Sequence, residues 1–184
     1  MKKGNVFSML GLCLATGCSE ALAHGPHVHG TGELQVAVEN NNVDVEFHSP
    51  LDNLLGFEHI PKTASQHAAV KAMTTKLNKP EALFILPKAA SCTADPAHID
   101  SPLNSAPATP SKSAKPAHKE DNGEEHADLT ATFRFVCTNV AELDSIEIAI
   151  FDAFPGTRTI KAEIIGPRGQ SAATLSPNHR VIKF

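Results

Sequence analysis

Residues 33–48 read E-L-Q-V-A-V-E-N-N-N-V-D-V-E-F-H, and this stretch decides the fold. Apolar residues occupy every second position on each side of the asparagines, which is the pattern of two half-buried strands. Asparagine tolerates positive φ, so the asparagine run suits a turn. We therefore predict a β-hairpin with strands at 33–38 and 43–48. A turn at the centre of this run would place Glu33 opposite His48.

Histidines lie on both sides of the predicted hairpin. His24, His27 and His29 precede it, while an apolar run at 51–57, expected to be a loop packed under the hairpin, leads to Glu58 and His59. Imidazole is the commonest metal ligand in proteins and binds in its neutral form. His27 and His29 are two positions apart, so on an extended backbone they point to one face. These residues are the first candidates for a zinc site.

The first 23 residues have the features of a signal peptide. Lys2 and Lys3 precede a short apolar run at 6–15, and Ala21-Leu22-Ala23 fits the small-x-small cleavage pattern. We expect cleavage after Ala23, an exported chain that begins at His24, and a bacterial periplasmic location. An alternative is a lipoprotein acylated at Cys18. Nothing after residue 23 has the length and apolarity of a transmembrane span.

Composition limits the class of protein. The leader holds Lys2, Lys3 and Glu20, so its removal would reduce 16 basic and 20 acidic residues to 14 and 19, a net charge of −5. This balance argues against a nucleic-acid partner and weakly favours cations. The length after cleavage suits a single domain. There is no Trp or Tyr, so the core has to consist of Phe, Leu, Ile and Val.

Cys92 and Cys137 are the two cysteines outside the leader. Two cysteines in an oxidising compartment most often pair, so we predict a disulfide between them. Two buried thiols and a thiolate metal site are the alternatives. Neither cysteine has a second cysteine nearby at zinc-finger spacing, which favours the disulfide.

The rest of the chain predicts one helix and several strands. Residues 61–77 are expected to be helical, with Thr63 and Gln66 as a capping box and a core stripe that follows the helical period. Its members are Gln66, Ala69, Val70, Met73 and Leu77. Further strands are predicted at 82–86, 88–93, 129–137, 146–150, 159–165, 170–175 and 181–182. About eight short strands without βαβ alternation predict an α+β, mainly β fold, an antiparallel sheet or sandwich with one packed helix.

A Pro/Ser/Ala-rich segment at 96–125 interrupts this predicted domain, which spans 24–184. It has little apolar surface to offset the entropy of ordering, so we expect a disordered loop. His98 and His118 lie in it among acidic residues and are weaker metal candidates. Just after it, His126 is two residues before Asp128, so the two share a face if a strand begins there. Zinc readily takes such nitrogen and carboxylate ligands.

The sequence gives little support for an enzyme. It contains no G-x-S-x-G elbow, phosphate-binding loop, H-E-x-x-H motif or Rossmann glycine pattern. One enzymatic alternative is a copper oxidase, in which the amine and imidazole of an N-terminal His24 would form a histidine brace. A structural envelope protein with incidental histidines is another alternative.

Longer motifs closely resemble a known family. They are H-x-H-G at 27–30, E-L-x-V-A-V at 33–38, S-P-L-D-N-L-L-G-F-E-H at 49–59, P-E-A-L-F-x-L-P-x-A-A-x-C at 80–92, H-A-D-L-T-A-T-F-x-F-x-C at 126–137, F-D-A-F-P-G at 151–156 and G-Q-S-A-A-T-L at 169–175. Together they cover nearly all of the chain after the leader and resemble the ZrgA-like family. Its members are small exported proteins, produced under zinc limitation, that assist zinc uptake in the bacterial periplasm.

The resemblance implies zinc binding and a role as accessory to an ABC-type zinc importer, whose solute-binding protein would be a partner. Carried over onto this sequence, it points to five ligands: His27, His29, Glu58, His59 and His126. The central loop departs from the family pattern, which is a dense run of His, Asp and Glu. Here the loop has only His98 and His118, which argues against a high-capacity role and favours the site in the folded part.

Overall fold

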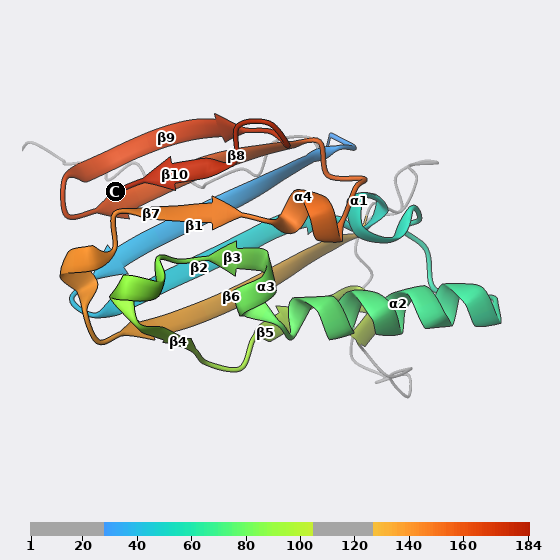
Figure 1. Cartoon of the computed structure of the whole chain (residues 1–184). Coiled ribbons are helices and arrows are strands. Elements are labelled where there is room, and N and C mark those ends of the chain that lie inside the picture. The colour runs from blue at the N-terminus through green and yellow to red at the C-terminus, as the bar shows by residue number, and fades with distance from the viewer. Residues whose placement is uncertain (1–27, 105–126) are drawn as a thin grey trace, which may run out of the picture.

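The computed structural model describes residues 28–104 and 127–184, and these form two sheets that face each other (Figure 1). The larger sheet runs in the order β4 (Cys92–Ala94), β6 (Asp128–Cys137), β2 (Asn42–Pro50), β1 (Thr31–Glu39), β8 (Thr159–Gly166) and β9 (Gly169–Leu175), with β5 (His98–Asp100) also paired to β6. The smaller sheet contains β10 (Val181–Lys183), β7 (Ser145–Ile148) and β3 (Phe84–Ile85). The predicted mainly β fold is confirmed.

The predicted hairpin is confirmed as β1 and β2, and Glu33 lies opposite His48 in its register. Asn40 adopts a φ of 53°, which is the turn conformation expected of asparagine. The apolar positions of both strands are buried except the half-buried Val38, while Glu33, Gln35 and Glu46 are exposed. One face of the hairpin therefore belongs to the core and the other carries polar groups.

The buried apolar side chains form one cluster between the two sheets. Strand β6, predicted at 129–137, contributes five buried residues at alternate positions, and they are Leu129, Ala131, Phe133, Phe135 and Cys137. Phe84 of the smaller sheet packs against Phe133 of the larger one, with ring centroids 4.9 Å apart. Pairing is antiparallel except between β1 and β8, which run parallel.

The predicted long helix is confirmed as α2 (Ala64–Leu77), and Thr63 with Gln66 forms the capping box. The predicted core stripe is only partly correct. Met73 and Leu77 are buried, but the other three members are half-buried because the N-terminal half of the helix runs past the sheets (Figure 1).

Three further helical segments correct the predictions. Residues predicted as an apolar loop form α1 (Leu51–Leu55), which ends at Gly56 in the left-handed region that favours glycine. The strand predicted at 82–86 is shortened to β3 at 84–85, because its first two residues belong to α3 (Pro80–Leu83), where proline suits the first helical turn. The strand predicted at 146–150 ends early, at α4 (Ile150–Ala153). Short 3-10 helices span Lys88–Ala90, Pro102–Asn104 and Val140–Glu142.

The disulfide between Cys92 and Cys137 is present and joins paired positions of β4 and β6. The first part of the segment expected to be disordered has defined secondary structure. Residues 98–100 form β5 because Ile99 packs against the core and the strand pairs with β6. The part of that segment from 105 onward, like the leader with Ala23 and Cys18, lies outside the described residues.

Within the described ranges, no helix has the length and apolarity needed to cross a membrane.

Candidate metal centre

His29 lies in a tight turn that leads into β1. The turn is closed by a hydrogen bond in which the Thr31 N–H donates to the Val28 carbonyl at 2.9 Å. Gly30 adopts a φ of 85°, and a Cβ at this position would meet the guanidinium of Arg158. Only glycine suits both constraints, so the H-G pair fixes the direction in which the His29 ring leaves the backbone.

Asn53 of α1 holds this turn against the start of the helix. It is 2% exposed, its side-chain oxygen accepts from the Gly30 N–H, and its amide donates to the Thr31 carbonyl at 3.0 Å. The same amide group also donates to the Ser49 hydroxyl at 3.0 Å. The buried Asn53 side chain of α1 therefore links this helix to β1 and β2 next to the turn that carries His29.

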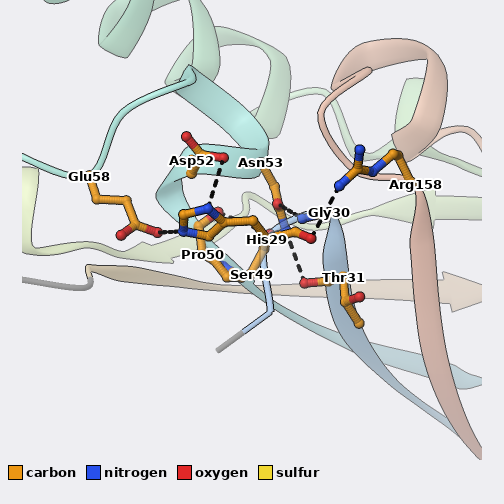
Figure 2. Close-up of polar contacts among 9 residues, drawn as sticks. All are labelled: His29, Gly30, Thr31, Ser49, Pro50, Asp52, Asn53, Glu58 and Arg158. Atoms are coloured by element: carbon orange, nitrogen blue, oxygen red, sulfur yellow. Dashed lines mark hydrogen bonds and ion pairs between the residues drawn. The ribbon is translucent and has the colours of Figure 1, made fainter. Parts of the chain in front are cut away.

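The His29 ring lies between two carboxylates (Figure 2). Its Nε2 is 3.2 Å from a Glu58 oxygen, and its Nδ1 is 3.6 Å from an Asp52 oxygen. The Glu58 side chain is 12% exposed and the His29 side chain 48% exposed, so the pair sits at the surface with the carboxylate recessed. We call His29 with Glu58 the His29 pair.

A second histidine–carboxylate pair lies on paired strands. Nε2 of His48 on β2 is 3.8 Å from an Asp128 oxygen on β6, and its Nδ1 is 3.2 Å from the Thr130 hydroxyl. Both members are about one-fifth exposed, at 23% and 22%. We call His48 with Asp128 the His48 pair.

The two pairs belong to the same end of the larger sheet. Pro50 is the register partner of Asp128, and the next residue, Leu51, starts α1 by donating its N–H to the Ala127 carbonyl at 2.9 Å. The Asn53 side chain, which bonds to Gly30 and Thr31 after His29, also bonds to Ser49 after His48 (Figure 2). The junction of β2 with α1 therefore carries His48 on one side and the partners of His29 on the other.

Both histidines have the same arrangement of partners. In each, Nδ1 faces a protein oxygen and Nε2 faces a carboxylate. Metal-binding histidines commonly use one ring nitrogen for the ion and the other for an orienting oxygen. Within 28–104 and 127–184, no three His, Cys, Asp or Glu side chains are grouped to hold one ion. The described residues thus bring together histidine–carboxylate pairs, and a four-coordinate metal site would need further ligands.

The other predicted ligands are placed as follows. His59 is exposed, its ring stacks on Phe57, and its Nδ1 donates to the Ile60 carbonyl at 2.9 Å. His98 is exposed on β5, opposite Thr132. His24, His27, His118 and His126 lie outside the described residues. Of the predicted set, the structure brings together His29 and Glu58, and the role of each residue as a ligand stays a prediction.

Asp52 and His48 are absent from the predicted ligand set. Asp52 lies six residues before Glu58, within the S-P-L-D-N-L-L-G-F-E-H motif, but a loop prediction gave its side chain no direction. His48 was placed correctly opposite Glu33, and its alternation with the buried Phe47 put it on the polar face. The sequence did not show that β2 pairs with β6, which is what brings His48 close to Asp128.

Comparison with known proteins decides the family. The model described as "ZrgA family zinc uptake protein" matches residues 26–184. The chain belongs to the ZrgA family. A search of curated proteins found no match. ZrgA family members are described by zinc uptake rather than by an enzymatic activity, and the match includes both histidine–carboxylate pairs.

Proposed function

We propose that this ZrgA family protein binds a zinc ion in the bacterial periplasm and passes it to the solute-binding protein of an ABC-type zinc importer. The ion is held at the His29 pair. His27 and His126 are the further ligands, and His59 is an outer ligand that the ion meets on arrival or departure. Zinc is the cargo of the protein in this account.

The distance between Nε2 of His29 and the Glu58 oxygen is the observation that supports the proposal most strongly. Zinc bonds to histidine nitrogen and carboxylate oxygen are about 2.0–2.2 Å long, so two such ligands in a tetrahedral site are about 3.3–3.6 Å apart. Nε2 of His29 and the Glu58 oxygen are 3.2 Å apart. An ion can therefore replace the proton between them with little movement of either side chain. The 3.6 Å contact to Asp52 leaves that carboxylate to orient the ring through Nδ1.

The sequence places a predicted ligand two residues before a member of each pair. His27 precedes His29, and His126 precedes Asp128. His27 is two positions from His29, and the Ala127 carbonyl, next to His126 in the chain, accepts from the Leu51 N–H at the start of α1. This closeness supports a four-coordinate site in which the His29 pair supplies two ligands and these upstream histidines complete it.

Different observations support the export of the protein and its delivery of the zinc ion. The predicted signal peptide and the family's zinc-uptake role both favour a periplasmic location. An accessory to uptake has to release its ion, and a surface pair with a half-exposed histidine suits transfer better than a closed structural site would.

Isothermal titration with zinc tests the site. The double variant His27→Ala/His29→Ala should lose the tightest binding phase, while the matched double variant His98→Ala/His118→Ala should lose only weak binding. The reverse order would place the site on the central loop. Metal content of protein purified from periplasm without added metal tests identity, and copper in place of zinc would contradict the proposal.

A further inference from the structure

Helix α2 is attached to the protein through its C-terminal half. Met73 and Leu77 are its two buried residues, and both lie in that half. Residues 64–72 contain no buried side chain, and Figure 1 shows this half extending beyond both sheets. The capping box and the frequent alanines favour the helix there, where Gln66, Ala69 and Val70 are only half-buried. Its outer surface is thus one that the protein does not use for its own core.

This helix is basic on an acidic protein. Residues 59–80 contain four lysines and no Asp or Glu. The chain has a net charge of −4, so the remaining residues carry −8 once these four lysines are set aside. Lys76 is used internally, since it donates to the Ala153 carbonyl at 2.6 Å and lies over the Phe154 ring. The other three lysines are exposed.

The three exposed lysines lie along the length of the helix. Lys71 is in the helix, and Lys62 and Lys79 lie just beyond its two ends. The exposed residues that share a face with Lys71 at helical spacing are Ala64, His67, Ala68 and Thr75. Across the described residues, none of these three lysines takes part in an ion pair. We call the three lysines with these four residues the basic α2 face.

The basic α2 face is connected to the metal centre. The N-cap Thr63 follows Glu58 by five positions, and the Gln66 amide nitrogen lies 3.4 Å from the His59 ring. The metal centre itself carries carboxylates at Asp52 and Glu58. A partner with an acidic surface is attracted by the helix and repelled by the carboxylates. Such charge patterns set the orientation and rate of docking.

The chemistry of this face favours a protein partner over a lipid surface. Helices that lie in a membrane surface carry bulky Trp, Phe or Leu opposite their basic residues. The basic α2 face has only alanine, threonine and histidine beside its lysines. Small side chains allow another folded protein to approach closely, but they do not provide the apolar surface needed to insert into a membrane.

We propose that the basic α2 face docks a second protein through an acidic surface of that protein, which thereby receives the zinc ion beside His59. The docking is inferred from the helix, and the identity of the cargo rests on the proposed function. Charge-reversed variants of the full exported chain test it, with a fluorescein-labelled glutamate decapeptide as the probe and a labelled Gly/Ser decapeptide as the neutral reference.

Fluorescence anisotropy at low salt should show tighter binding of the glutamate peptide than of the neutral one. The variant Lys62→Glu/Lys71→Glu/Lys79→Glu should bind it about tenfold more weakly. The matched variant Lys88→Glu/Arg168→Glu/Lys183→Glu has the same change of net charge at exposed positions and should lose less than about twofold. Circular dichroism confirms that both variants are folded.

Three results would overturn the docking proposal. They are equal loss in the two variants, equal binding of the two peptides, and tighter lysine-dependent binding to phosphatidylglycerol vesicles than to the glutamate peptide. Zinc titration of the same samples is a separate readout, and the α2 variant should bind zinc as the wild-type protein does. Peptide binding without zinc binding would reject the proposed function and leave the docking surface in place.

Discussion

The two histidine–carboxylate pairs are built on different supports, and this difference predicts different roles for them in the proposed site. The His29 pair stands on a turn and on the segment that follows the five-residue helix α1, with its histidine 48% exposed and a nitrogen–oxygen separation of 3.2 Å. The His48 pair stands on adjacent strands, with its histidine 23% exposed and a separation of 3.8 Å. The pair on the turn lies at the surface, and its nitrogen and oxygen are about as far apart as two ligand atoms of one zinc ion. The strands supply a more enclosed pair whose ring would have to move to share an ion.

The largest contrast is expected from removing each histidine in turn. His29→Ala should weaken zinc binding about 100-fold or more, because it deletes a proposed ligand, whereas His48→Ala should weaken it less than about tenfold, because the carboxylate partner of His48 is Asp128 and not Glu58. Competition with a chromophoric chelator measures both. Equal losses would show that the two pairs hold the ion jointly.

The support of the His29 pair can be broken without touching a ligand. Asn53→Ala leaves the Gly30 N–H and the Thr31 carbonyl without their partner, so the free energy of unfolding should fall by about 2–3 kcal/mol. Urea denaturation measures this value. The control Asn139→Ala removes one exposed hydrogen bond to the Ala89 carbonyl and should cost less than about 0.5 kcal/mol. A small effect at Asn53 would mean that the turn holds its shape by itself.

The smallest contrast concerns the groups that orient the two rings. Asp52→Asn should reduce zinc affinity about tenfold, since the Nδ1 partner of a ligand sets its tautomer and basicity. Thr130→Val removes the corresponding partner of His48 and should change affinity less than about threefold. Both variants are nearly isosteric, so titration compares orientation alone. A larger effect at Thr130 would identify the His48 pair as the main one.

Local pattern was sufficient to predict most of the fold. The hairpin, its register, the face of β6 and the capped helix all follow from alternation, turn residues and capping within a few positions. The sequence did not predict α1 because five residues are too few to show a helical period. It also did not predict β5, whose order depends on pairing with a strand about thirty residues away in the chain.

The site was predictable only where its members are close in sequence or carried by a motif. His29 and Glu58 were expected ligands, and the structure brings them together across 29 positions. Asp52 was missed because its direction depends on α1, and His48 because its partner Asp128 comes from β6. Pairing of distant strands is a tertiary property that residue spacing alone does not contain.

The most direct test is to locate the ion. Crystals of the zinc-loaded protein should give an anomalous difference peak at the zinc edge about 2.0–2.2 Å from both Nε2 of His29 and an oxygen of Glu58. A peak bound by His98, or one held by His48 and Asp128 without His29, would contradict the account.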